Sequence, residues 1–342
     1  MTSAPRSLHA GETPPEQGPP GVDPAPSAVA AARAAAPDAA ATAQAAARPP
    51  AAVNIADVAP ARRSFALKAR DWASDDPFAV VALIVLLTIV ACSIFAPWIS
   101  PYDPTLQDYD VILMPPSADY LLGTDDLGRD VFSRLIHGAS ASVYAAFLAV
   151  GVAAFLGIPV GLIAGYAGGW VDDVISRIID TFLSFPAIVL AIAVTGVLGI
   201  GLTNAMISVG IVFAPQLARL ARARTLVLKQ ELYVDAARCF GASPTRILWK
   251  HVLPNAIQPV LVQMTLLMAV ALLAEASLSF LGLGMQPPEP SWGGMIARAY
   301  LYMQIAPEQM YAPGLAILAT ALAFNTLGES LREAMDPTSG KT

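Results

Sequence analysis

The chain has 342 residues, of which 56% are hydrophobic and only 13% are charged, with a formal net charge of −6. Because a soluble domain carries about 25% charged residues, this composition excludes an ordinary soluble protein and predicts a membrane protein. The acidic balance provides no basic surface for nucleic acid. The two cysteines, Cys92 and Cys239, give neither a disulfide framework nor a metal-binding spacing.

The amino-terminal segment differs from the rest of the chain. Residues 1–60 contain 21 alanines and 11 prolines, with few aromatic or large aliphatic side chains. Such a segment buries too little apolar surface to offset the entropy cost of ordering it. We therefore expect a disordered tail at 1–60.

The remaining sequence is rich in long apolar stretches. A helix needs about 20 mainly apolar residues to cross a bilayer, and six stretches meet this requirement. The sequence therefore predicts an all-α integral membrane protein with six transmembrane helices. Pro159, Pro186 and Pro215 fall inside apolar stretches and predict kinks in a packed bundle. The six predicted spans lie at about 78–99, 139–166, 182–200, 202–221, 256–283 and 311–331.

Lysine and arginine residues indicate how the spans are oriented. They gather before the first span and at 219–250, whereas the stretch 100–138 holds seven aspartates against two arginines. The positive-inside rule places both termini and 219–250 in the cytoplasm, and 100–138 and 284–310 outside. The expected domains are the tail at 1–60, an amino-terminal region at 61–138 with the first span and first external loop, and a core at 139–338 with the other five spans.

Three glycines recur at four-residue spacing within the second span, namely Gly157, Gly161 and Gly165. Small residues at this period let two helix backbones approach closely. The pattern predicts that the second span packs against a partner helix.

One acidic residue, Glu275, lies well inside an apolar run. A charge at the bilayer centre costs about 2.5–3.5 kcal/mol on insertion scales, so Glu275 is expected to face the bundle interior or a wet cavity. Structural pairing, a position near the membrane surface and a place on the substrate path all remain open. Trp292 is a second candidate for the substrate path.

The cytoplasmic segment 231–255 predicts two short helices joined at a glycine. Leu232, Ala236 and Phe240 share one face of the first helix, and Gly241 is suited to the left-handed conformation that ends it. Ser243 is a helix-capping residue, and Pro244 fits the first helical turn. Such a pair forms a knob that a soluble partner can grip. The apolar side of the second helix contains Ile247, Leu248, Val252 and Leu253.

The same segment resembles the EAA loop of ABC-importer permeases. The shared pattern is Asp235-Ala236-Ala237, then Gly241, then Leu253-Pro254, with aspartate where the family has glutamate. The resemblance implies that this loop seats in a groove of a cytoplasmic ATPase and transmits its motion. The residues expected to carry this coupling are Asp235, Ala236, Ala237, Arg238, Gly241, Ala242, Ser243, Leu253 and Pro254.

Three further stretches, 123–138, 280–294 and 323–337, are similar to the C-type subunit of the dipeptide, oligopeptide and nickel permease group. The resemblance implies a type I importer bundle in the cytoplasmic membrane that moves di- and oligopeptides by alternating access. Its implied partners are membrane lipid, a homologous second permease, one or two ABC ATPases and an extracytoplasmic substrate-binding protein. ATP and magnesium are then expected on the ATPases, with no enzyme activity, cofactor or metal in this chain.

Two other functions compete with peptide import. Permeases for nickel chelates, glutathione or antimicrobial peptides share these motifs. A membrane sensor that kept the fold without transporting is a more remote alternative. The presence of Gly241 and Leu253-Pro254 favours a working coupling loop.

Overall fold

The computed structural model describes residues 76–335. Two units divide the chain, 1–64 and 65–342, and the described residues all belong to the second. The predicted tail at 1–60 lies outside the described residues. Between 76 and 335 the regular structure is helical, with one isolated bridge between Thr124 and Asp130.

Within residues 76–335, five helical segments are long and apolar enough to cross a membrane, and a bent helix pair supplies a sixth crossing when it is counted as one span. The structure therefore confirms an all-α membrane bundle, with five or six spans where the sequence predicts six. The bent pair consists of α6 (Gly169–Leu183) and α7 (Ala187–Leu198). The five long helices are α4 (Pro77–Ile99), α5 (Val131–Ala167), α8 (Leu202–Leu228), α11 (Leu253–Phe280) and α13 (Tyr311–Met335).

The predicted third span at 182–200 is wrong as a continuous helix. The chain breaks at 184–186, and α7 turns by 96° relative to α6. Pro186 explains the break, because it lacks an N–H and disfavours the helical conformation in Phe185. Hydropathy missed α6 because it is amphipathic: Asp172, Asp173 and Asp180 share a polar face and lower the mean hydropathy of the segment. The second span also begins earlier than predicted, at Val131.

The closest helix contact joins α5 and α8. A Cβ atom added at Gly161 would lie only 2.2 Å from the Ala218 carbonyl oxygen, so the backbones touch there. This contact confirms the predicted partner helix. Residue numbers rise together along both helices, so α5 and α8 run parallel, and α6 with α7 must return the chain between them. The other close approaches are Gly157 to Ala214, Gly165 to Arg222 and Gly210 to Ala149.

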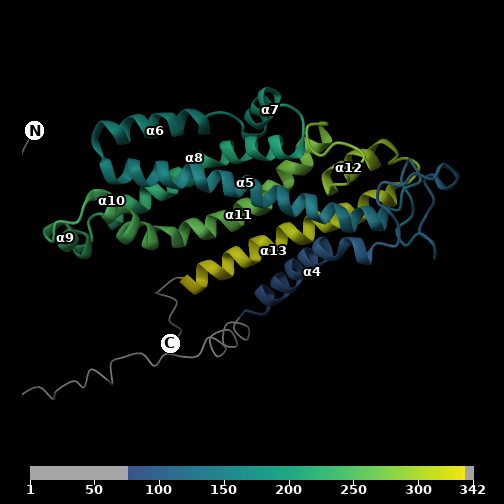
Figure 1. Ribbon diagram of the computed structural model, residues 1–342, viewed down its shortest axis with the longest axis horizontal. Helices are drawn as coiled ribbons and strands as arrows, with labels where there is room; N and C mark the ends of the chain where they lie inside the picture. Colours follow the sequence, from purple (N-terminus) through teal and green to yellow (C-terminus); the bar gives the residue numbers. More distant parts are fainter. Residues whose placement is uncertain (1–75, 336–342) are drawn as a thin grey trace, which may run out of the picture. The chain divides into compact units, whose positions relative to one another are not determined.

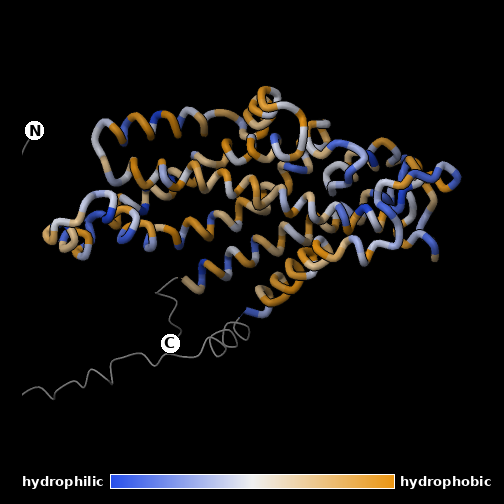
Figure 2. The backbone as a smooth tube through the Cα atoms, in the orientation of Figure 1, coloured by the Kyte–Doolittle hydropathy of each residue, from blue (hydrophilic) through white to orange (hydrophobic). Residues whose placement is uncertain are grey.

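The remaining helices surround this pair (Figure 1). α11 packs against α5, α8 and α13, and α4 packs against α5 and α13. Figure 2 shows apolar residues through the middle of the bundle and hydrophilic residues in the loops at its ends. The loop 101–130 and α12 (Trp292–Leu301) lie at the end opposite α9 (Leu232–Cys239) and α10 (Pro244–Ile247).

A buried ion network organises the end that carries the loop 101–130. Arg129 is 1% exposed, and its Nη2 lies 2.6 Å from Asp125 Oδ2. Asp126 reaches Arg298 of α12 at 3.4 Å. Gln309 donates a hydrogen bond of 2.8 Å to the Thr124 carbonyl oxygen. These contacts fix the loop to α12 and to the short 3-10 helix η3 (Pro307–Met310).

We predict that Gly161→Ala destabilises the protein by about 1–3 kcal/mol, because overpacking a close contact displaces backbone. Gly151 provides a matched control on the same helix, since nothing lies within 4 Å of an added Cβ there. Thermal unfolding of the purified protein in detergent measures both changes. Equal stability of Gly161→Ala and Gly151→Ala would show that α5 and α8 are not closely packed.

Candidate functional site

The predicted coupling segment forms two helices joined by a sharp turn. Gly241 has φ +76°, the Gly241 N–H bonds to the Arg238 carbonyl oxygen and the Ala242 N–H to that of Ala237. These two bonds make the Schellman arrangement that ends a helix. Ser243 then caps α10 by accepting a hydrogen bond from the Arg246 N–H at 3.4 Å. The local geometry expected for Gly241 and Ser243 is therefore confirmed.

One side of the helix pair is buried against the bundle. Val234 of α9 and Ile247 of α10 pack with Leu162, which lies near the end of α5. The predicted apolar side of the second helix is confirmed, because Ile247, Leu248 and Val252 are buried and Leu253 is half-buried. A π turn, η2 (Leu248–Val252), then leads directly into α11. The pair is thus seated on α5 and continuous with α11.

The other side of the pair is open. Leu232 is 85% exposed and Phe240 is 91% exposed, with Ala236 between them on the same face. We call this apolar face, made of Leu232, Ala236 and Phe240, the outer face of the knob. Beside it, Arg238 pairs with Asp235 at 2.9 Å and lies 5.8 Å from the ring centre of Tyr166.

The predicted coupling residues divide between these two sides. Ala237, Ala242 and Leu253 are half-buried and contact the cluster around Val234. The exposed members are Asp235, Ala236, Arg238, Gly241, Ser243 and Pro254. Their part in coupling stays a prediction.

Glu275 and Trp292 join three helices. Glu275 is fully buried on α11, and its Oε1 accepts a hydrogen bond from Ser279 at 2.7 Å. The other carboxylate oxygen faces Gly293, where an added Cβ would lie 3.0 Å away. Trp292 Nε1 donates to the Leu135 carbonyl oxygen of α5 at 2.9 Å. Glu275 and Trp292 therefore hold the start of α12 against α11 and α5, and their place on a substrate path stays a prediction.

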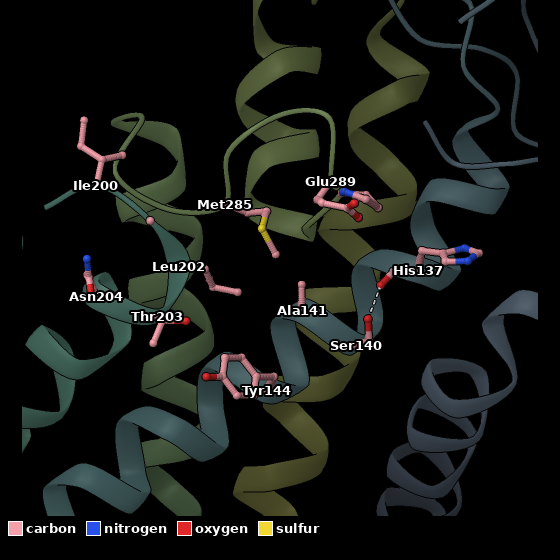
Figure 3. A pocket seen from close by; sticks show the side chains of 12 residues that line it. His137, Ser140, Ala141, Tyr144, Ile200, Leu202, Thr203, Asn204, Met285 and Glu289 are labelled. Atoms are coloured by element: carbon pink, nitrogen blue, oxygen red, sulfur yellow. Dashed lines mark hydrogen bonds between the residues drawn. The ribbon is translucent and has the colours of Figure 1, made fainter. Parts of the chain in front are cut away.

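A cavity of about 660 Å³ opens near the end of the bundle that carries α12. Figure 3 shows Ala141 and Tyr144 from α5, Leu202 and Thr203 from α8, and Glu289 from the loop after α11 around it. Neither Glu275 nor Trp292 lines this cavity. Sequence reasoning missed it because its walls come from three segments far apart in the chain. No single motif marks them.

The bundle, with a cavity at one end and a seated helix pair at the other, is that of a membrane transport subunit. The chain belongs to the family of binding-protein-dependent transport system inner membrane components, whose model matches residues 157–340. Residues 74–116 match the N-terminal transmembrane domain of oligopeptide transport permease C. The chain is therefore a multi-span permease subunit of an ABC importer.

Named relatives agree with this family. A glutathione transport system permease protein of Pectobacterium atrosepticum is 44% identical over 76% of this chain and 86% of its own length. A dipeptide transport system permease protein of Alkalihalophilus pseudofirmus is 40% identical over 84% of this chain and 93% of its own length. A chain of the MetNI methionine ABC transporter aligns with 59% of this chain and 97% of its own length, at 22% identity and a TM-score of 0.49.

We predict that Glu275→Ala destabilises the purified protein by about 1–3 kcal/mol, because it leaves buried polar groups without a partner. Glu275→Gln keeps the shape and most of the hydrogen bonding, so its melting temperature should stay near that of the wild type. Thermal unfolding distinguishes the two variants. A Glu275→Gln protein with unchanged stability and strongly reduced uptake would instead place Glu275 on the substrate path.

Proposed function

We propose that this chain forms one half of the membrane passage of an ATP-driven importer for short peptides. The relatives named for dipeptide and glutathione transport support this cargo, since glutathione is itself a short peptide. Nickel chelates and antimicrobial peptides are the competing cargoes. The chain alternates between a form open to the outside and a form open to the cytoplasm, around a passage shared with a homologous second permease.

The observation that carries this proposal is the outer face of the knob. Leu232 and Phe240 lie together with Ala236 on one exposed apolar face, and contiguous exposed apolar patches outside the membrane mark interaction sites. The knob is also fixed to α5 and α11, so a partner that moves it moves the bundle. We assign this face to a cytoplasmic ATPase subunit, on which ATP and magnesium bind.

The orientation of the chain follows from the same assignment. In Figure 1, the first turn of α4 and the last turn of α13 both face the side of the bundle that carries α9 and α10. With the knob in the cytoplasm, both termini are cytoplasmic. The loops 101–130 and 281–310 are then outside, where an extracytoplasmic binding protein docks and delivers cargo to the cavity.

ATP can drive transport only if its binding favours one of the two conformations of the bundle over the other. A ligand shifts an equilibrium only by binding one state better than the other. ATP binding closes the two ATPases and so favours one position of the knob. The binding protein, loaded with cargo, favours one position of the outer loops.

We predict that Gly241→Val abolishes ATP-driven uptake while the protein still inserts into the membrane. Nothing lies within 4 Å of an added Cβ at Gly241, so the defect comes from its positive φ alone. A β-branched residue is strained in that conformation, and Gly241→Ala should cause a smaller loss. Peptide uptake by cells and the amount of protein in the membrane fraction are the two measurements. Normal uptake by Gly241→Val would contradict the coupling role.

We predict that Phe240→Asp prevents copurification of the ATPase subunits from solubilised membranes. A carboxylate in the centre of an apolar interface is left without a partner when water is excluded. Cys239→Ser is the matched control, because Cys239 is the exposed neighbour of Phe240. If Phe240→Asp recovers as much ATPase as Cys239→Ser does, the outer face is not part of the interface with the ATPase. Absence of ATPases from the wild-type preparation would favour the sensor function.

A further inference from the structure

The cavity of about 660 Å³, which we call the outer cavity, has an acidic lining. Glu289 is the one acidic side chain among the described residues that line it, and neither lysine nor arginine is among them. The ring of His137 points away from the other labelled side chains (Figure 3), and its Nδ1 lies 3.0 Å from the Ser133 carbonyl oxygen. A cavity of this volume falls within the range of about 300–1,000 Å³ that is typical of small-molecule sites.

Glu289 stands on a loop that the surrounding structure holds in place. Arg134 donates a hydrogen bond of 3.3 Å to the Pro288 carbonyl oxygen, directly before Glu289. After Glu289, Pro290 is buried, and Ser291 is buried and caps the start of α12. The Glu289 side chain itself is exposed. The loop therefore presents this carboxylate at a fixed place on the cavity wall.

The Glu289 carboxylate takes part in no hydrogen bond or ion pair with the described residues. Three arginines line an adjoining cavity of about 310 Å³, to which Glu289 also contributes, yet each of them is bonded to another group. Because these cations are held elsewhere, the carboxylate is free to bind a ligand that carries a positive charge. The partners of the arginines are Asp125 for Arg129, Asp126 for Arg298 and the Pro104 carbonyl oxygen for Arg134.

The outer cavity also offers hydroxyl oxygens that can accept hydrogen bonds. The hydroxyls of Tyr144 and Thr203 bond to no other residue of the lining (Figure 3). Ser140 donates its own proton to the His137 carbonyl oxygen at 2.7 Å, so its oxygen remains an acceptor. An ammonium group has three donors and no acceptor. The lining thus matches an ammonium group better than a carboxylate.

The surface around the cavity mouth has the same sign. The stretch 100–138 holds seven aspartates against two arginines, and both arginines, Arg129 and Arg134, are buried. Surfaces with one sign of charge raise the local concentration of ligands of the opposite sign. The outer end of the bundle therefore attracts cations toward the cavity. The exposed aspartates of this stretch are Asp103, Asp108, Asp110 and Asp119.

We propose that Glu289 binds the amino-terminal ammonium group of the cargo in the outer cavity and so selects peptides whose amino terminus is free. The inference rests on the proposed import function. A carboxylate and an ammonium group form a charge-assisted hydrogen bond, which is stronger than a neutral one. The hydroxyl oxygens of Ser140, Tyr144 and Thr203 supply further acceptors for the same group.

The first test is the charge selectivity of the cavity in the complete importer. The background of this chain carries Cys92→Ser and Cys239→Ser, which removes both native thiols. Ser140→Cys then places a reactive thiol on the cavity wall. The complex, with its second permease and ATPases but without the binding protein, is placed in lipid nanodiscs. A cationic and an anionic methanethiosulfonate reagent of similar size are compared, and labelling is measured on this chain.

We expect Glu289→Gln to lower the ratio of cationic to anionic labelling rates at position 140 about fivefold, because it removes the charge and keeps the shape. Asp119→Asn, which neutralises an exposed acid outside the cavity, should leave this ratio nearly unchanged. An unchanged ratio in Glu289→Gln would overturn the proposal. So would labelling of position 140 at the slow rate of a buried thiol with both reagents, because another subunit would then fill the cavity.

The second test asks whether the ammonium group of the cargo is the group that binds. Dialanine should slow the labelling of position 140. N-acetyl-dialanine lacks the ammonium group and should need an about tenfold higher concentration for the same protection. In Glu289→Gln the two peptides should protect alike. Equal protection by both peptides in the chain that keeps Glu289, or protection by neither, would rule out the contact.

Peptide uptake separates this inference from the import function. ATP-dependent uptake of dialanine into proteoliposomes, by the wild-type complex with its binding protein, shows whether the importer moves peptides. If it does, Glu289→Gln should lower kcat/KM for dialanine about tenfold, and uptake at the wild-type level would contradict the contact with cargo. If the wild type moves no dialanine, the import proposal fails, while the labelling ratio still shows whether Glu289 gives the cavity its preference for cations.

Discussion

The close contact between α5 and α8 is the constraint on which the rest of the bundle depends. The backbones touch at Gly161 and Ala218, and this approach is possible only because α5 lacks a side chain there. The two helices run parallel along this contact, so the chain must return between them through α6 and α7. The same two helices supply walls of the outer cavity, and α5 also carries Leu162, which seats the knob. The cavity walls and the seat of the knob are therefore built on the same pair of helices.

The two sides of the knob are both apolar, but one is buried against the bundle and the other is exposed. Val234 and Ile247 are buried because they fix the pair to the bundle, while Leu232 and Phe240 remain exposed although they are just as apolar. Helical spacing alone does not distinguish these sides, because both show the same period. The turn at Gly241 sets the angle between the helices and so decides which residues point outward. A permease in which this turn is distorted keeps its spans and loses the shape that its proposed partner recognises.

Much of the fold was predictable because hydropathy, glycine spacing and turn chemistry are local. The spans at 78–99 and 311–331, the partner helix for Gly161 and the cap at Ser243 follow from such patterns. A kink at Pro186 was predicted, but the complete break and the 96° turn were not, because proline is tolerated in many membrane helices and the sequence alone does not show where it ends one. The burial of Glu275 agrees with the expected interior position, whereas its neighbour Gly293 could not be predicted, since it approaches from a different helix. The 660 Å³ cavity could not be predicted for the same reason, because its walls come from three segments far apart in the chain.

The length of α5 has a mechanical consequence. With 37 residues it is about 55 Å long, well beyond the roughly 30 Å of the apolar core. One end carries Arg134, which lies 3.5 Å from Asp125 of the ion network, and the other end carries Leu162, on which the knob is seated. Pro159 is its one internal weak point, and the glycine contacts at Gly157 and Gly161 brace the helix on either side of it. α5 thus connects the ion network at one end to the knob at the other, and a tilt of this helix about its middle moves the two ends in opposite directions.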